Sequence, residues 1–179
     1  MAKSEILVPF IKSWEGGFVN HPNDKGGATN KGITIGTFRS VYGQGKSVED
    51  LKRITDAQWQ YIFRRLYWNR WQADDIASQS IANLLVDWVW LSGRYGITIP
   101  QALLGVKVDG IAGPKTVAAI NACEPSLLFR QLWSDRKAYI EMIASKPGQS
   151  VFLKGWMRRL NSIKYGRLEC NGGKTLWCW

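Results

Sequence analysis

Apolar residues recur at every third or fourth position along most of the chain, a pattern that predicts a mostly helical protein. The first stripe, with Leu7 and Phe10, spans residues 4–14 and stops before Gly16 and Gly17, where a helix is expected to end. The glycine-rich residues 16–34 that follow are predicted to form a loop or a small β-hairpin.

Start signals mark two of the later helices. Thr55 and Gln58 have the spacing of a capping box, and Pro114 suits the first position of a helix. Apolar stripes predict further helices, and they run through Trp59, Ile62 and Phe63; Ile81, Leu84 and Trp88; Leu128, Leu132 and Tyr139; and Phe152, Trp156, Leu160 and Ile163.

Polar and acidic residues cluster at 73–78, where they indicate a division between residues 1–75 and residues 76–179. The chain has no linker rich in Gly, Pro or Ser at this point. We therefore expect the two regions, the second of them helical, to pack as one globule.

The chain has 24 Lys and Arg residues against 14 Asp and Glu, a net charge of +10 over 179 residues. Such an excess favours a polyanionic partner, whether nucleic acid, an anionic membrane surface or the acidic bacterial cell wall. The basic residues are scattered and form no run, so we expect no nucleic-acid partner.

Histidine and cysteine are scarce. With His21 as the only histidine, no spacing of zinc ligands is present, and we expect no metal and no cofactor. Cys170 and Cys178 flank the segment NGGKTLW and would clamp a terminal loop if oxidised, although a reduced pair is equally consistent.

No secretory signal peptide and no stretch of about 20 apolar residues is visible. We expect a soluble monomer that is made in the cytoplasm, has no integral membrane segment, and acts elsewhere only after release or export.

Two acids stand out in the glycine-rich segment. Glu15 lies at the predicted end of the first helix, where the helix dipole and the neighbouring rings of Trp14 and Phe18 are expected to raise its pKa. Asp24 lies among Asn and Gly residues, a polar setting that favours the ionised form. Two carboxylates in contrasting environments are the usual equipment of a glycoside hydrolase. The alternative is a tight turn in which Asp and Asn side chains bond to local amides.

The motifs EGGFVN, D-x-G-G-x-T at 24–29 and N-K-G-I-T at 30–34 resemble the N-terminal motif of glycoside hydrolase family 108. This family contains N-acetylmuramidases of bacteria and their phages within the lysozyme-like superfamily. The resemblance continues at 66–68 and in IANLLVDWVWLSG at 81–93, and the C-terminal half, with VDGIAGPKT, is similar to the predicted peptidoglycan-binding domain that accompanies the family.

The resemblance implies an α+β, predominantly helical, lysozyme-like fold with a small β-hairpin after the first helix. It also implies hydrolysis of the β-1,4 bond between N-acetylmuramic acid and N-acetylglucosamine in peptidoglycan. A non-catalytic wall-binding or regulatory protein on the same fold is the alternative.

The resemblance also implies the catalytic residues. Glu15 matches the catalytic glutamate, while Asp24 and Thr29 match an acid and a threonine of phage-type lysozymes. Thr34 competes with Thr29 as the hydroxyl that holds a water molecule, and Asp24 is either a participant or a loop-structuring residue. The expected substrate-binding residues are Thr34, Asn20, His21, Trp68 and Trp71, with core packing as the alternative for the two tryptophans and a surface turn for His21. Asp87, a charge inside an apolar helix, is expected to have a structural partner such as an arginine.

Overall fold

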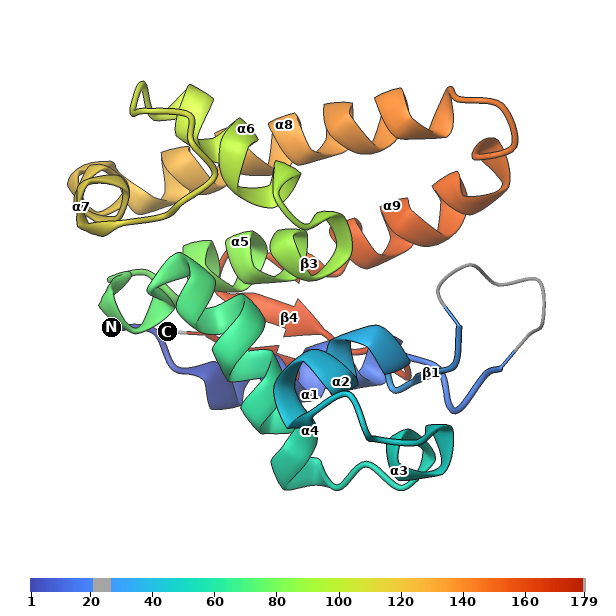
Figure 1. The fold of residues 1–179 in the computed structure, drawn as a ribbon. Helices are drawn as coiled ribbons and strands as arrows, with labels where there is room; N and C mark the ends of the chain where they lie inside the picture. Colours follow the sequence, from blue (N-terminus) through green and yellow to red (C-terminus); the bar gives the residue numbers. More distant parts are fainter. Residues whose placement is uncertain (21–26, 179) are drawn as a thin grey trace.

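The computed structural model describes residues 1–20 and 27–178, which form a mostly helical α+β protein (Figure 1). Its helices are α1 (Ser4–Trp14), α2 (Ile35–Tyr42), α3 (Val48–Lys52), α4 (Asp56–Phe63), α5 (Gln79–Ser92), α6 (Tyr95–Leu103), α7 (Pro114–Ala122), α8 (Pro125–Ala144) and α9 (Leu153–Asn161). The strands are β1 (Thr29–Asn30), β2 (Ile33–Thr34), β3 (Ile163–Lys164), β4 (Arg167–Glu169) and β5 (Thr175–Trp177). Short helical turns occupy Arg64–Trp68, Asn69–Trp71, Ala73–Asp75 and Ser150–Phe152.

The predicted hairpin after the first helix is confirmed. β1 and β2 pair antiparallel and are joined by Lys31 and Gly32, whose φ angles are +50° and +77°. Two consecutive positive φ angles are typical of the type I′ turn, which fits the twist of a two-residue hairpin. Thr29 also exchanges two backbone hydrogen bonds of 2.8 Å with Val19. This bridge ties the chain just after α1 to the first strand of the hairpin.

Helix boundaries with strong local signals are also confirmed. Helix α1 ends at Trp14, and Glu15 is already extended, with φ −90° and ψ 141°. The capping box of Thr55 and Gln58 is present at the start of α4, and Pro114 begins α7.

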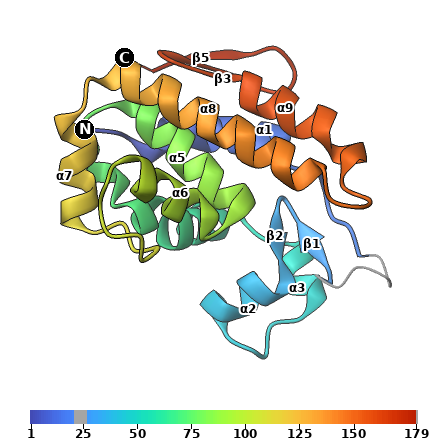
Figure 2. The same ribbon diagram turned by 90° about the horizontal axis from the view of Figure 1, so that it is seen from above.

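Helix α5 lies at the centre of the protein. Every one of its residues from Gln79 to Val89 is buried, and it packs against α6 and α8 (Figures 1 and 2). Figure 2 shows β1, β2, α2 and α3 extending to one side of these helices. One continuous hydrophobic core contains residues of α1, α4, α5, α8 and β4, so both halves of the described chain share it. None of the helices in residues 1–20 and 27–178 is long and apolar enough to cross a bilayer.

The C-terminal region differs from its prediction as an entirely helical segment. Helix α9 ends at Asn161, and Ile163 belongs to β3 of a three-stranded antiparallel sheet in the order β3-β4-β5. The turns of this sheet use Gly166, at φ +81°, and Gly172, at φ +116°. These strands are two or three residues long, too short for the apolar periodicity to indicate them.

The register of this sheet separates two cysteines. Arg167 pairs with Trp177 and Glu169 with Thr175. Cys178 then lies next to Gly166, whose carbonyl accepts its N–H, and Cys170 donates to the carbonyl of Lys174. The two cysteines are therefore four residues apart along the paired strands, a separation of about 14 Å. Two Cα atoms more than about 7 Å apart cannot be bridged by a disulfide.

We therefore predict that Cys170 and Cys178 do not form a disulfide with each other in the folded protein. After exposure of the native protein to air, alkylation under denaturing conditions is expected to label all three cysteines, and mass spectrometry counts the labels. A sample reduced before labelling is the control. A single label in the oxidised sample, with three in the control, would contradict the register.

Candidate active site

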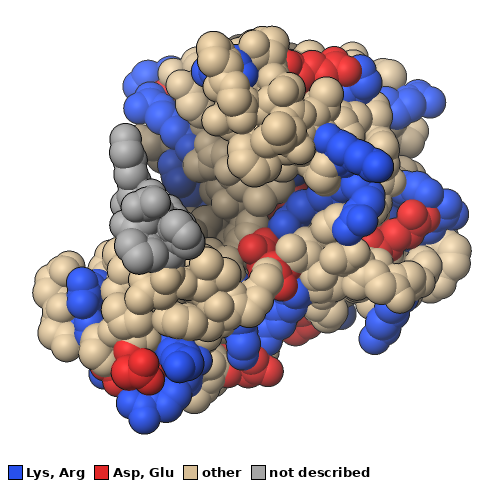
Figure 3. All heavy atoms as spheres, turned by 90° about the vertical axis from the view of Figure 1, so that its right-hand side faces the viewer, with Lys and Arg blue, Asp and Glu red and all other residues tan. Residues whose placement is uncertain are grey.

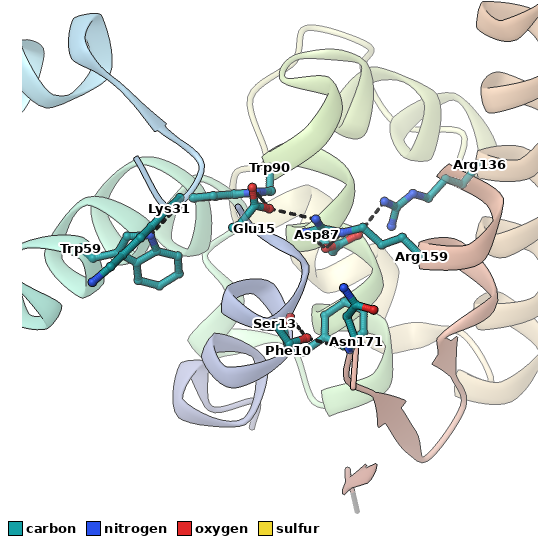
Figure 4. Close-up of polar contacts among 10 residues, drawn as sticks. All are labelled: Phe10, Ser13, Glu15, Lys31, Trp59, Asp87, Trp90, Arg136, Arg159 and Asn171. Carbon is teal, nitrogen blue, oxygen red and sulfur yellow. Dashed lines mark hydrogen bonds and ion pairs between the residues drawn. The ribbon is translucent and has the colours of Figure 1, made fainter. Parts of the chain in front are cut away.

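The carboxylate of Glu15 is held at the end of α1 by donors from two distant elements. Trp90 Nε1, from α5, and Arg159 Nη1, from α9, both donate to Glu15 Oε1 at 2.8 Å (Figure 4). The Glu15 side chain retains 15% of its exposure. The sequence pattern predicted a helix end and flanking rings as its surroundings, whereas the structure adds a guanidinium and an indole N–H.

Arg159 also connects Glu15 to a buried carboxylate. Arg159 Nε and Nη2 donate to Asp87 Oδ1 at 3.1 and 2.8 Å. Arg136 of α8 donates to Asp87 Oδ2 at 2.6 Å and to the carbonyl of Leu84 at 3.3 Å. The chain Glu15–Arg159–Asp87–Arg136 alternates in sign and sums to zero when both carboxylates are ionised, and we call it the ion network. The expected arginine partner of Asp87 is confirmed.

Charges within the ion network stabilise one another. Burial alone would raise the pKa of Asp87, but the guanidinium groups of Arg159 and Arg136 hold it below its usual value. Burial opposes the charge of Arg159, yet Asp87 and Glu15 together raise its pKa above the usual value. The pKa of Arg136 is lowered by burial, which its contact with Asp87 only partly offsets.

The turn of the hairpin lies directly against Glu15. A Cβ atom on Gly32 would come within 2.5 Å of Glu15 Oε2 and 2.7 Å of the Trp90 ring. The carbonyl of Lys31 accepts a hydrogen bond of 2.8 Å from Trp59 Nε1, which fixes the turn on α4. Only glycine fits this close approach at a positive φ.

An aromatic wall surrounds the same point. The ring of Trp90 lies 4.5 Å from that of Tyr67, 5.5 Å from Trp59 and 5.9 Å from Phe63, measured between centroids. Trp90 and Tyr67 are partly exposed, so their rings can contact a sugar while the other two complete the core. Figure 3, which views the molecule from the right-hand side of Figure 1, shows a hollow with acidic and basic side chains beside it.

The two candidate threonines face each other across the hairpin, since Thr29 pairs with Thr34. The hydroxyl of Thr34 caps α2, because it accepts from Thr37 N at 3.1 Å and bonds to Thr37 Oγ1 at 3.0 Å. The Thr29 hydroxyl has only a long contact of 3.4 Å to the carbonyl of Gly27 among the described residues. Its oxygen is therefore the less committed of the two.

The other predicted site residues differ in their exposure to solvent. Asn20 is exposed, and His21 and Asp24 lie outside the described residues. Trp68 and Trp71 are fully buried, so the prediction that they contact the substrate is wrong. Trp68 Nε1 donates to Asp74 Oδ1 at 2.9 Å. The π-helical turn Arg64–Trp68 changes the phase of the helix and directs these rings into the core.

Sequence reasoning assigned no role to Trp90, Arg159, Arg136 or Gly32. Asp87 and Trp90 are three residues apart on one helix, so they project to the same side. Arg136 interrupts the apolar stripe of α8. This spacing and this buried charge were the signals in the sequence that could have indicated the roles of Trp90 and Arg136. Within residues 1–20 and 27–178, no group of three or more His, Cys, Asp or Glu side chains could hold a metal ion.

A carboxylic acid at the end of the first helix, backed by a hairpin in a helical α+β fold, is the arrangement of a lysozyme-like glycosidase. Residues 8–93 match the family model Glycosyl hydrolase 108, and residues 95–161 match the model Predicted Peptidoglycan domain. The chain belongs to the glycosyl hydrolase 108 family and is a glycoside hydrolase that acts on peptidoglycan.

A solved structure supports the same assignment. The structure of SagA from Brucella abortus is 32% identical, with a TM-score of 0.78, and the match covers 90% of this chain and 92% of that one. A comparison with curated proteins gave no match. The two family matches meet between residues 93 and 95, later than the division at 73–78 that polar composition indicated, so the central helix α5 falls within the hydrolase match.

Gly32→Ala is expected to lower hydrolysis of purified peptidoglycan by about 10²-fold, because the new Cβ displaces Glu15 and Trp90. Gly148→Ala is the matched control, with a φ of +76° and no atom within 4 Å of the added Cβ. Both variants carry a backbone strain of about 1–2 kcal/mol. Equal activity of the two variants in an assay of solubilised wall fragments would contradict the close contact.

Asp87→Asn is expected to lower the free energy of unfolding by about 3–5 kcal/mol at pH 7, because it leaves two buried arginines without their shared carboxylate. The folded-state pKa of Asp87 is depressed, so its contribution is present above about pH 4 and is lost as the pH falls further. Urea unfolding at pH 7 and pH 3 measures both effects, with exposed Asp75→Asn as the control. A difference from wild type that does not shrink at pH 3 would contradict the depressed pKa.

Proposed function

We propose that the protein is an N-acetylmuramidase that cleaves the β-1,4 bond between N-acetylmuramic acid and N-acetylglucosamine, with Glu15 as the general acid. The observation that carries the proposal is the asymmetric anchoring of its carboxylate. Both donors reach Oε1, and no hydrogen bond from the described residues reaches Oε2. One oxygen therefore fixes the group, while the other is available to carry the proton to the glycosidic oxygen.

Its surroundings support this role. The carboxylate lies between the hairpin turn and the partly exposed rings of Trp90 and Tyr67, which offer flat faces to a pyranose ring. Protonation of the leaving oxygen is the first requirement of glycoside hydrolysis.

The second requirement is a group that activates water. We assign this role to Asp24 on the basis of its sequence motif, with a hydroxyl of the hairpin holding the water molecule. Thr29 suits that hydroxyl better than Thr34, whose oxygen already caps α2. A water-mediated reaction of this kind inverts the anomeric configuration, and it requires about 6.5–9.5 Å between the two carboxyl groups.

Glu15→Gln is expected to lower the rate at which purified cell walls are cleared by about 10²–10⁴-fold, because the amide cannot donate a proton to the leaving group. Glu49→Gln, at an exposed glutamate of α3, is the matched control and should clear walls like the wild type. Asp24→Asn in the same assay tests the second carboxylate.

The products distinguish the possible bonds. Muramic acid at the new reducing ends would support the muramidase assignment, and glucosamine there would replace it with a glucosaminidase. A Glu15→Gln variant that clears walls as fast as wild type would overturn the role of Glu15. Wall binding without clearing by the wild type would favour a non-catalytic wall-binding protein.

A further inference from the structure

One of the hydrogen bonds between the two matched parts of the chain reaches Glu15. Glu15 lies in the hydrolase match, residues 8–93, and Arg159 lies in the peptidoglycan-domain match, residues 95–161. They are 144 positions apart in sequence, yet Arg159 Nη1 lies 2.8 Å from Glu15 Oε1 (Figure 4). A domain that served only to bind the wall would have no need to contact the acid of the other domain.

We propose that the C-terminal part completes the catalytic site: Arg159 is a positioning residue for Glu15, and Asp87 with Arg136 sets how much of its charge acts on Glu15. The proposal rests on the proposed function of Glu15 as the acid. It gives residues 95–161, the peptidoglycan-domain match, a role in the reaction in addition to any role in wall binding.

The orientation of Arg159 comes from its bonds to Asp87. Two of the three nitrogens of its guanidinium bond to Asp87 Oδ1, which fixes the plane of the group, and the third then points at Glu15. The ring of Phe10 lies below, 6.0 Å from Arg159 Cζ. The Arg159 side chain is only 7% exposed, so the surrounding residues leave it little freedom to turn away.

The sharing of charge explains how an arginine can hold a general acid in place. An arginine paired with Glu15 alone would strongly favour the ionised carboxylate and so oppose the transfer of its proton. Here two of the donors of Arg159 serve Asp87, and Arg136 balances the other oxygen of Asp87. Glu15 therefore receives orientation from one bond without the undivided charge of a dedicated cation.

Among the described residues, Arg159 is the one side chain that forms an ion pair with Glu15. Trp90 of α5 is a neutral donor, and Tyr67 is a phenol whose pKa is raised, chiefly by burial, so it stays neutral in the working range. On the hairpin turn, the ammonium of Lys31 pairs with Asp56 at 3.6 Å. Arg159 is thus the cation whose removal changes the field at Glu15 most directly.

The test compares Arg159→Gln, Arg159→Lys and the control Arg158→Gln, whose guanidinium is exposed and lies 5.1 Å from the ring of Trp14. Wall hydrolysis is measured from about pH 4 to pH 9, with wall pelleting for binding and thermal unfolding for stability. Arg159→Gln leaves Asp87 paired with Arg136, so the variant keeps one buried ion pair.

Arg159→Gln is expected to lower turnover by about 10²-fold, since Glu15 loses its alignment. It should also move the alkaline limb of the pH profile upward by about one unit, because an acid without a neighbouring cation keeps its proton to higher pH. Arg159→Lys should keep the limb near its wild-type position and recover part of the turnover. Asp87→Asn, where circular dichroism shows it folded, should move the limb downward, because Arg159 then acts on Glu15 alone.

The Arg159 variants should bind walls like the wild type in the pelleting assay. Arg158→Gln should have the pH–activity profile of the wild type. An unmoved limb in Arg159→Gln, or lost wall binding with unchanged turnover of the bound enzyme, would overturn the proposal and leave Arg159 a structural or binding residue. Failure of the proposed function has a different signature, because Glu15→Gln would then remain active. An inactive Glu15→Gln together with an unmoved limb in Arg159→Gln refutes only the role of Arg159.

Discussion

The structure depends most on the buried carboxylate of Asp87. Its side chain is fully buried in the middle of α5, where an ion without partners would cost several kcal/mol. Satisfying it requires a guanidinium on each side, from Arg136 of α8 and Arg159 of α9. The three helices must therefore come together in one arrangement, and the same arrangement brings Arg159 to the end of α1. The same contacts thus fix both the packing of these helices and the geometry of the candidate active site.

The hairpin is constrained from the other side of the site. Its two-residue turn is compatible with the strand twist only at positive φ, and Gly32 leaves room there for the carboxylate of Glu15. Trp59 anchors the turn through the carbonyl of Lys31. Glu15 is consequently bounded by the hairpin turn on the side of Oε2 and by the donors Trp90 and Arg159 on the side of Oε1, and these contacts hold its carboxylate in a defined direction.

Local signals predicted the end of α1, where Glu15 lies, and the starts of α4 and α7, because a glycine stop, a capping box and a proline at a helix start act within a few residues. The partners of Glu15 were beyond such reasoning: Arg159 contacts Asp87 and Glu15 across 72 and 144 positions. A charge inside an apolar helix indicated that Asp87 had a partner without identifying it. Trp68 was misassigned because a π-helical turn changes the helical phase, which periodicity assumes to be constant.

The zero net charge of the ion network bears on how the enzyme meets its substrate. The net charge of +10 must come from side chains outside this network, and most of these are exposed to solvent and salt. Attraction between a basic surface and acidic wall polymers is screened over about 8–10 Å at ordinary ionic strength, whereas buried pairs are screened far less. Salt should therefore weaken encounter with the wall before it alters the contact between Arg159 and Glu15. The surface charges that would draw the protein to the wall are therefore physically separate from the buried ion pairs that hold Glu15.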